Sequence, residues 1–349
     1  MSDRPQPTYA VVPSALDVPS ERAFVERFTA FSHQLSRNLG SRYGSTHGKI
    51  MKATNLAKEA HDRHLRAAGV SRLVRDQQVQ LARLARRGAT LTGPCTLHAV
   101  DEWAAALHEA SPWMSEVGTF LMRHMRRAVE KGRFGLSIPP ILLVGPPGDG
   151  KTTYARLIAE LSGTPFRQID VGSGSAGFRI TGLERGWSSA QSGVPVEMML
   201  DRGVANPLLI VNEVDKAHGV RSTKGSVNDL ETSLLQLLEP ETASRFECPS
   251  LRVPFDLSRA SWILTANDLQ AVPDPLVDRC TVFRMPEVTP SVAGLMFDAI
   301  ARNHEVIDQE LLCQVRDMVI GASRTGSLSL RTIQRVLAGL EQLPGNVLH

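Results

Sequence analysis

Residues 141–152 read ILLVGPPGDGKT, and this stretch decides the fold class. Its first four residues are all apolar, which predicts a short strand buried on both faces of a sheet. The eight residues that follow fit the pattern G-x-x-x-x-G-K-[ST], with Lys151 and Thr152 at its end. Between a buried strand and a helix, this pattern marks a glycine loop that surrounds phosphate groups. The stretch therefore predicts an α/β protein with a phosphate-binding loop.

The chemistry of this loop suits a nucleoside triphosphate. Its glycines let backbone N–H groups turn inward, and the following helix adds its positive N-terminal end. Lys151 can reach the β and γ oxygens, and Thr152 offers a hydroxyl to Mg²⁺. We therefore expect ATP and Mg²⁺ as cofactors. The expected nucleotide-binding residues are Gly145, Pro146, Pro147, Gly148, Asp149, Gly150, Lys151, Thr152 and Thr153.

Short apolar runs alternate with helical segments after the loop, and they end at Pro286. This alternation predicts a mostly parallel sheet flanked by helices. The chain beyond Pro286 reads as helical only, which predicts a separate helical subdomain. The expected strands lie at 166–171, 208–211, 262–265 and 282–284, and the expected helices at 152–161, 196–202 and 229–238.

The N-terminal part of the chain differs from the rest in charge. Residues 1–90 carry 15 Lys or Arg against 7 Asp or Glu, a balance of +8, although the whole chain has a formal net charge of only +3. They read as mostly helical, with a partly amphipathic stretch at 71–87. We expect three regions: a basic helical region at 1–92, an α/β region with lead-in helices at 93–286, and a helical subdomain at 287–349.

The composition narrows the class of protein. The chain has 349 residues, of which 42% are hydrophobic and 21% charged, as is typical of globular proteins. No apolar run approaches the roughly 20 residues that span a bilayer, and the N-terminus lacks the pattern of a signal peptide. The four cysteines form no CxxC pair, so neither a zinc site nor a redox motif is indicated. We expect a cytoplasmic protein without membrane association.

A second polar cluster follows the apolar run at 208–211. A carboxylate at the tip of a strand beside the phosphate loop can polarise the attacking water, and Glu213 is placed for that role. Asn212 stands where an aspartate that orients the metal is expected. Its amide keeps the shape but lacks the charge that helps to hold Mg²⁺, so we expect Thr152 and Asn212 on the metal side and slow hydrolysis. Asn212→Asp is then expected to raise turnover.

The segment 141–335 resembles the ATPase module of Lon-type AAA+ proteases. Four blocks follow the order and spacing of that family: NPLLIVNEVDKA (206–217), SLLQLLEPE (233–241), VPFDLSRASWILTAND (253–268) and VPDPLVDR (272–279). Generic nucleotide-binding proteins do not share these blocks. The resemblance implies a P-loop AAA+ module with a C-terminal helical lid, Mg²⁺-dependent ATP hydrolysis, and assembly into a homo-oligomeric, hexamer-type ring.

The resemblance also implies roles for single residues. Asn267 resembles sensor 1, which helps to position the attacking water. Arg279 resembles the arginine finger, which reaches the ATP of a neighbouring subunit, and Arg331 resembles sensor 2 in the lid. Trp187 resembles the aromatic residue of a pore loop that grips polypeptide, although Ser188 replaces the aliphatic residue expected next to it. A loop anchor packed on the core is the alternative for Trp187.

These features predict an ATP-driven AAA+ protein that remodels polypeptides as a ring. Lon has a Ser and Lys peptidase domain after its ATPase module, and because the sequence ends at His349 we expect no protease activity from this chain alone. The alternative is a nucleotide-gated ATPase switch that binds nucleic acid through residues 1–90, since basic helices suit phosphate backbones. A solvated helical face or a docking surface for a partner protein explains the same charge. A third alternative is an unfoldase that serves a separate peptidase.

Overall fold

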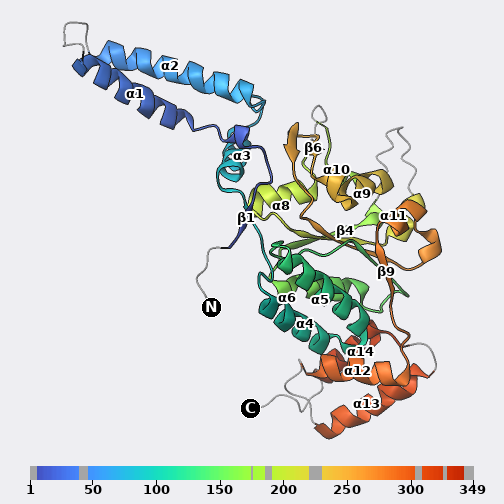
Figure 1. The fold of residues 1–349 in the computed structure, drawn as a ribbon. Coiled ribbons are helices and arrows are strands. Elements are labelled where there is room, and N and C mark those ends of the chain that lie inside the picture. Colours follow the sequence, from blue (N-terminus) through green and yellow to red (C-terminus); the bar gives the residue numbers. More distant parts are fainter. Residues whose placement is uncertain are drawn as a thin grey trace.

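The computed structural model describes residues 6–38, 46–173, 176–184, 191–219, 230–302, 309–324 and 328–341. A hairpin of two long helices, α1 and α2, projects from one end of the α/β core, and α12–α14 lie at the opposite end (Figure 1). Within the described residues, no helix is long and apolar enough to cross a membrane.

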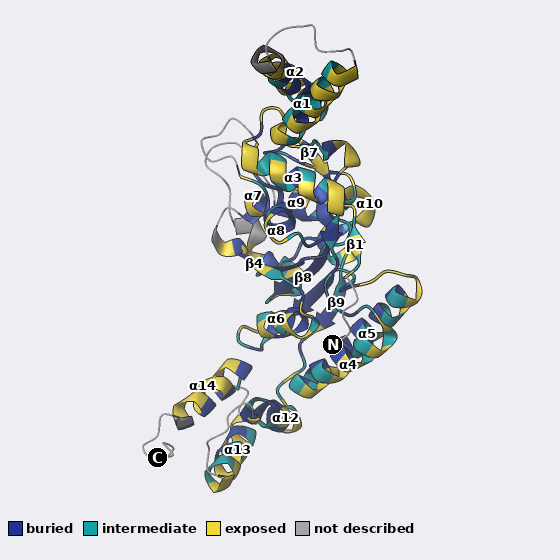
Figure 2. Cartoon of the chain, turned by 90° about the vertical axis from the view of Figure 1, so that its left-hand side faces the viewer, coloured by how far each residue is buried: buried dark blue, intermediate teal, exposed yellow. Residues whose placement is uncertain are grey.

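A wholly parallel, five-stranded sheet forms the centre of the protein, with the strand order β4-β5-β8-β3-β9. Its strands are β3 (Ile141–Val144), β4 (Phe166–Asp170), β5 (Leu208–Asn212), β8 (Ser261–Ala266) and β9 (Thr281–Arg284). Every residue of β3, β5 and β8 is buried, and Figure 2 shows this buried centre in dark blue. The predicted α/β fold with a parallel sheet is confirmed.

Helices cover both faces of the sheet, because successive side chains of a strand point to opposite faces. Ile141 and Leu143 of β3 face one hydrophobic cluster, whereas Leu142 and Val144 face the other. The first face packs on α4 (Leu97–Ala110), α5 (Ser115–Glu130) and α6 (Lys151–Ser162). The second packs on α3 (Arg75–Arg87), α7 (Ala176–Thr181), α8 (Val194–Arg202) and α9 (Leu230–Leu238).

Three further helices follow the sheet and pack around a core of their own, which includes Phe297, Ile333 and Leu337. Thr289 caps the first of them by accepting a hydrogen bond from the backbone N–H of Val292. The helix therefore begins at Pro290, within the part beyond Pro286 that the sequence predicts to be helical. The helices are α12 (Pro290–Ala301), α13 (Gln309–Ser323) and α14 (Leu330–Glu341). The helical reading of this part of the chain is confirmed.

The N-terminal region has two parts that pack differently. The hairpin of α1 (Glu21–Asn38) and α2 (Thr46–Ala67) is held by a small cluster around Phe24. The segments before and after the hairpin instead contribute buried side chains such as Val11 and Leu81 to the hydrophobic cluster on the face of the sheet that α3 and α7–α9 cover. A domain boundary at residue 92 stays a proposal. Residues on both sides of it contribute to the same hydrophobic cluster.

Several short elements have no counterpart in the sequence-based prediction. Strand β1 (Thr8–Tyr9) pairs with β2 (Ala89–Thr90), and β6 (Phe246–Cys248) pairs with β7 (Val253–Phe255), both antiparallel. The remaining short helices are η1 (Ser14–Leu16), η2 (Pro112–Met114), η3 (Val171–Ser173), η4 (Val214–Gly219), α10 (Pro240–Ala243), η5 (Leu269–Ala271) and α11 (Asp274–Asp278). They connect the larger elements without altering the order of the sheet.

Candidate nucleotide-binding site

The glycine loop joins β3 to α6 at the carboxyl edge of the sheet. Gly148 and Gly150 have φ angles of 95° and 90°, a left-handed region that glycine adopts without steric cost. A Cβ atom at Gly150 would also collide with the side chain of Leu330 in α14. The φ angle of Gly150 therefore requires glycine, whereas the contact with α14 involves the end of the Leu330 side chain.

Lys151 begins α6 and is only 7% exposed. Its Nζ donates to the carbonyl oxygens of Gly145 and Pro146, at 2.6 and 2.9 Å, and to Oδ1 of Asn267 at 3.0 Å. Burial lowers the pKa of Lys151, and the negative charge of Asp149 opposes that shift. The ammonium group is thus held over the loop by three oxygens, where a phosphate oxygen can replace one of them.

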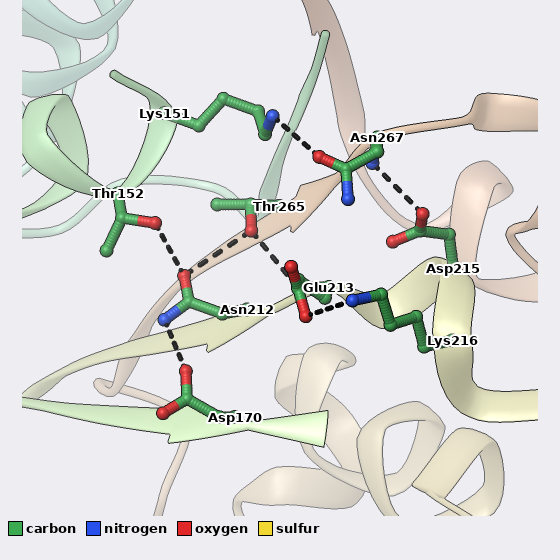
Figure 3. A network of polar contacts seen from close by, with 9 residues as sticks. All are labelled: Lys151, Thr152, Asp170, Asn212, Glu213, Asp215, Lys216, Thr265 and Asn267. Atoms are coloured by element: carbon green, nitrogen blue, oxygen red, sulfur yellow. Dashed lines mark hydrogen bonds and ion pairs between the residues drawn. The ribbon is translucent and has the colours of Figure 1, made fainter. Parts of the chain in front are cut away.

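A chain of polar contacts connects the loop to the neighbouring strands (Figure 3). Oγ1 of Thr152 donates to Oδ1 of Asn212 at 2.9 Å, and Nδ2 of Asn212 donates to Oδ1 of Asp170 at 2.8 Å. Oγ1 of Thr265 also lies 3.4 Å from the same oxygen of Asn212. The amide of Asn212 therefore uses its oxygen and its nitrogen on opposite sides.

Glu213 directly follows β5 and has a φ of 61°, which is unusual for a residue other than glycine. Its backbone N–H donates to Oγ1 of Thr265 at 3.2 Å, so a contact across the sheet helps to hold this conformation. Its carboxylate accepts a hydrogen bond from Nζ of Lys216 at 2.7 Å. A strained backbone conformation persists only where the surrounding structure holds it in place, and such residues cluster at functional sites.

Asn267 follows β8 and reaches Lys151 with its side chain. Its backbone N–H donates to Oδ2 of Asp215 at 3.2 Å. Oδ1 of Asp215 is buried, and no described residue hydrogen-bonds to it. A buried acceptor without a donor is costly, so this oxygen is suited to a water or a ligand.

The first turn of α14 closes the site from the side of the C-terminal helices. The backbone N–H of Arg331 donates to the carbonyl oxygen of Gly148 at 3.2 Å, which joins α14 to the loop. A cavity of about 150 Å³ lies between them. Its lining includes Pro147, Gly148, Gly150, Lys151, Thr152, Thr153, Glu213, Thr265, Asn267, Leu330, Arg331 and Gln334. The fold thus brings most of the sequence-predicted site residues around one cavity.

Comparison with known proteins assigns this part of the chain to a family. Residues 141–287 match the family described as "ATPase family associated with various cellular activities (AAA)". This segment is similar to AAA ATPase domains. The match begins with β3 and ends after β9, so it spans the whole sheet and the glycine loop.

Proteins similar to this part of the chain include Lon proteases. The chain is 40% identical to the Lon protease of Magnetococcus marinus over 174 residues, which are 50% of this chain and 20% of that protein. It is 36% identical to the peroxisomal Lon protease homolog 2 of Kluyveromyces lactis over 165 residues, or 46% and 16% of the two chains. It is 31% identical to Lon protease 2 of Sorangium cellulosum over 243 residues, which are 64% of this chain and 29% of that protein. The resemblance to the Lon ATPase module is confirmed, and the chain spans less than a third of each relative.

One residue singled out in the sequence, Arg279, lies apart from the cavity. Arg279 follows α11 at the opposite end of the sheet, since Thr281 pairs with the first residue of β3 whereas the glycine loop follows the last. Its guanidinium pairs with Oε1 of Glu239 at 2.7 Å. Trp187, together with its neighbour Ser188, lies outside the described residues.

The structure adds three residues that the sequence did not single out. Asp170 and Thr265 contact Asn212, and Lys216 pairs with Glu213. For Asp170 a signal was present, because it ends the strand next to the one that Asn212 ends, and parallel strands place their carboxyl ends at one edge. For Lys216 the signal is its position three residues after Glu213 on η4.

The oxygen donors beside the glycine loop fit Mg²⁺, the metal that we expect to accompany the nucleotide. Among the described residues, no cluster of three or more His, Cys, Asp or Glu side chains could hold a metal. The Thr152 hydroxyl, the Asn212 amide oxygen and the unpaired oxygen of Asp215 are hard ligands near the loop. Mg²⁺ keeps several waters and binds through substrate phosphates with few protein groups, so this sparse oxygen set suits it.

Proposed function

We propose that this protein is a Mg²⁺-dependent ATPase that assembles as a homo-oligomeric, hexamer-type ring and remodels polypeptides. The observation that carries the proposal is the cavity between the glycine loop and α14, where Lys151, Glu213, Asn267 and Arg331 converge. A phosphate site needs a cation and inward backbone N–H groups, and hydrolysis also needs a carboxylate for water. This cavity has a candidate for each.

Each side chain has a separate task in the proposed reaction. Lys151 binds the β and γ oxygens of ATP, and bound Mg²⁺ neutralises part of the phosphate charge. Glu213 accepts the proton of the attacking water, for which its carboxylate must turn from Lys216 towards the cavity. Asn267, which already contacts Lys151, positions that water, and Arg331 carries the state of the γ-phosphate to α14.

Assays of which molecule stimulates ATP hydrolysis distinguish a polypeptide substrate from a nucleic acid. We expect an unfolded polypeptide to raise the steady-state rate of ATP hydrolysis, whereas double-stranded DNA and single-stranded RNA leave it unchanged. The matched control is the same polypeptide in its folded form. Stimulation by nucleic acid with a steep salt dependence would support the nucleic-acid switch instead, and no response to either would contradict remodelling as the function.

The N-terminal hairpin favours a protein partner over nucleic acid. Its exposed large apolar side chains are mostly aliphatic: Met51 is 62% exposed, Leu56 52% and Leu35 46%, beside the aromatic Phe31 at 65%. Nucleic-acid surfaces combine basic groups with aromatic side chains placed for stacking, whereas exposed aliphatic side chains are typical of protein contacts. We therefore propose that α1 and α2 recognise a partner protein or the polypeptide substrate.

Arg279→Ala is expected to leave ATP binding intact and to lower hydrolysis by about 10³-fold, the lower range for an arginine finger. The reason is that Arg279 lies at the opposite end of the sheet from its own glycine loop, so it can reach ATP only on a neighbouring subunit. Mixing Arg279→Ala with Glu213→Gln subunits should restore part of the rate, because some interfaces then join an intact Arg279 to an intact Glu213. Steady-state ATPase assays of the mixtures measure this.

Two control variants separate this role from a structural one. Arg245→Ala removes an exposed arginine just before β6 and should leave the rate unchanged. Glu239→Gln weakens only the ion pair with Arg279. If Glu239→Gln lowers hydrolysis as much as Arg279→Ala does, or if mixed oligomers recover no activity, the arginine acts within its own subunit.

A further inference from the structure

The metal side of the cavity contains an arrangement that the sequence did not suggest. Asp170 ends β4, Asn212 ends β5, and the two are direct partners in the parallel register. Asn212 is only 7% exposed, and its Nδ2 lies 2.8 Å from Oδ1 of Asp170. The position that lacks the expected carboxylate thus adjoins one on the next strand.

The direction of the Asn212 amide follows from its partners. An ionised carboxylate only accepts hydrogen bonds, so the amide must turn its NH₂ group to Asp170. Its oxygen then faces the hydroxyls of Thr152 and Thr265, at 2.9 and 3.4 Å. A hydrogen bond to a charged acceptor polarises the amide and makes its oxygen a stronger acceptor on the other side.

We propose that Asp170 carries the negative charge that position 212 lacks, and that Asn212 relays it to the Thr152 hydroxyl and the metal beside it. Asp170 is thereby a positioning residue for the proposed ATPase, on which the inference rests. The charge lies one amide group from Oδ1 of Asn212, well inside the roughly 8 Å over which salt screens charges in solution.

This arrangement reverses the expectation for Asn212→Asp. A carboxylate at position 212 would stand within hydrogen-bonding distance of Asp170 with no donor between them. Two like charges at such a distance repel each other, although the exposure of Asp170 screens part of the repulsion, and the native hydrogen bond is lost. Restoring the expected aspartate alone therefore damages the site, unless Asp170 is replaced by Asn in the same chain.

The test compares four full-length proteins: wild type, Asp170→Asn, Asn212→Asp, and the exchange Asp170→Asn with Asn212→Asp. Two quantities are measured besides the ATPase rate: the Mg²⁺ concentration for half-maximal binding of a fluorescent ATP analogue, and Tm without nucleotide or metal. Asp170→Asn should raise the Mg²⁺ requirement about tenfold, as loss of a group behind a metal ligand does. Its affinity for the analogue in EDTA should not change, which a merely structural defect would alter.

The remaining variants test the coupling. Asn212→Asp should lower Tm by about 3 °C or more, the scale of a lost charge-assisted hydrogen bond in a chain of this size. The exchange rebuilds the bond with donor and acceptor reversed, so Tm and the Mg²⁺ requirement should return close to the wild-type values. Asp317→Asn, on the exposed side of α13, is the matched control and should change neither.

Several results would overturn the proposal. They are an unchanged Mg²⁺ requirement in Asp170→Asn, a Tm of Asn212→Asp equal to that of wild type, or an exchange variant no better than the worse single variant. Failure of the wild-type protein to bind any nucleotide would instead refute the proposed function. In that case the four melting temperatures, measured without ligand, still decide whether the two residues act as one unit.

Discussion

Replacing Glu213 by Gln is expected to leave ATP bound and to slow its hydrolysis by about 10²–10⁴-fold, the usual contribution of a general base. Gln has the same shape and keeps the left-handed backbone at φ 61° without a new clash. It cannot accept the proton of the attacking water. Single-turnover hydrolysis measures the loss, and binding of a fluorescent ATP analogue measures the affinity.

The matched control is Glu247→Gln, an exposed carboxylate on β6 outside the cavity, which should leave both quantities unchanged. A rise in affinity for the analogue would fit the role of Glu213, because ATP then persists in the site. Equal losses of affinity and rate would show that Glu213 supports the shape of the cavity and does not serve as the base.

Lys151→Ala is expected to abolish ATP binding at ordinary nucleotide concentrations. Hydrogen bonds that involve a charged group contribute about 1.5–3 kcal/mol each. Loss of two such bonds to the β and γ oxygens therefore raises the Kd for ATP by about a hundredfold or more. Arg331 also lines the cavity, but it lies on α14, whereas Lys151 is held over the loop by three oxygens. Calorimetric titration with ATP and Mg²⁺ measures the change.

The stability of Lys151→Met without nucleotide shows whether replacing Lys151 removes only ATP binding or also damages the fold. Burial lowers the pKa of Lys151 from its ordinary value of 10.5, so the folded protein holds this proton less firmly than the unfolded chain does. The charged lysine thus costs stability at neutral pH, and the contribution of this group improves as pH rises towards 10.5. Relief of this cost offsets the loss of the three hydrogen bonds of Lys151, so Tm should change little in Lys151→Met. Exposed Lys131→Ala serves as the surface control. A marked drop in Tm would mean that Lys151 supports the fold.

The sheet could be predicted from the sequence because its strands are buried on both faces. The continuous apolar residues of β3, β5 and β8 contrast with the polar loops that follow them, and the glycine loop marks the edge where the site lies. The two short antiparallel pairs could not be predicted. Strands of two or three residues show no periodicity, and β1 pairs with a partner some eighty residues away.

The same limit applies to the site. Lys151, Thr152 and Glu213 lie in motifs whose spacing predicts that they meet at one edge of the sheet, and they line one cavity. Their roles in hydrolysis stay predictions. The contact between Asp170 and Asn212 instead depends on the register of two strands that are 42 residues apart. The position of Arg331 depends on how α14 packs against the loop, and local sequence carries no record of that packing.

The N-terminal hairpin has the connectivity of an insertion. The chain enters it from η1, which is anchored by Leu16, and returns through Leu65 and Val70 to the same core. At its base, Phe24 of the outgoing helix contacts the rings of His61 and His64 on the returning one, at 5.6 and 5.0 Å. A protease cut inside the hairpin would therefore give two fragments that stay joined until the protein is denatured. A short flexible bridge from the start of α1 to the end of α2 would excise the hairpin and spare the core that truncation at residue 90 would remove.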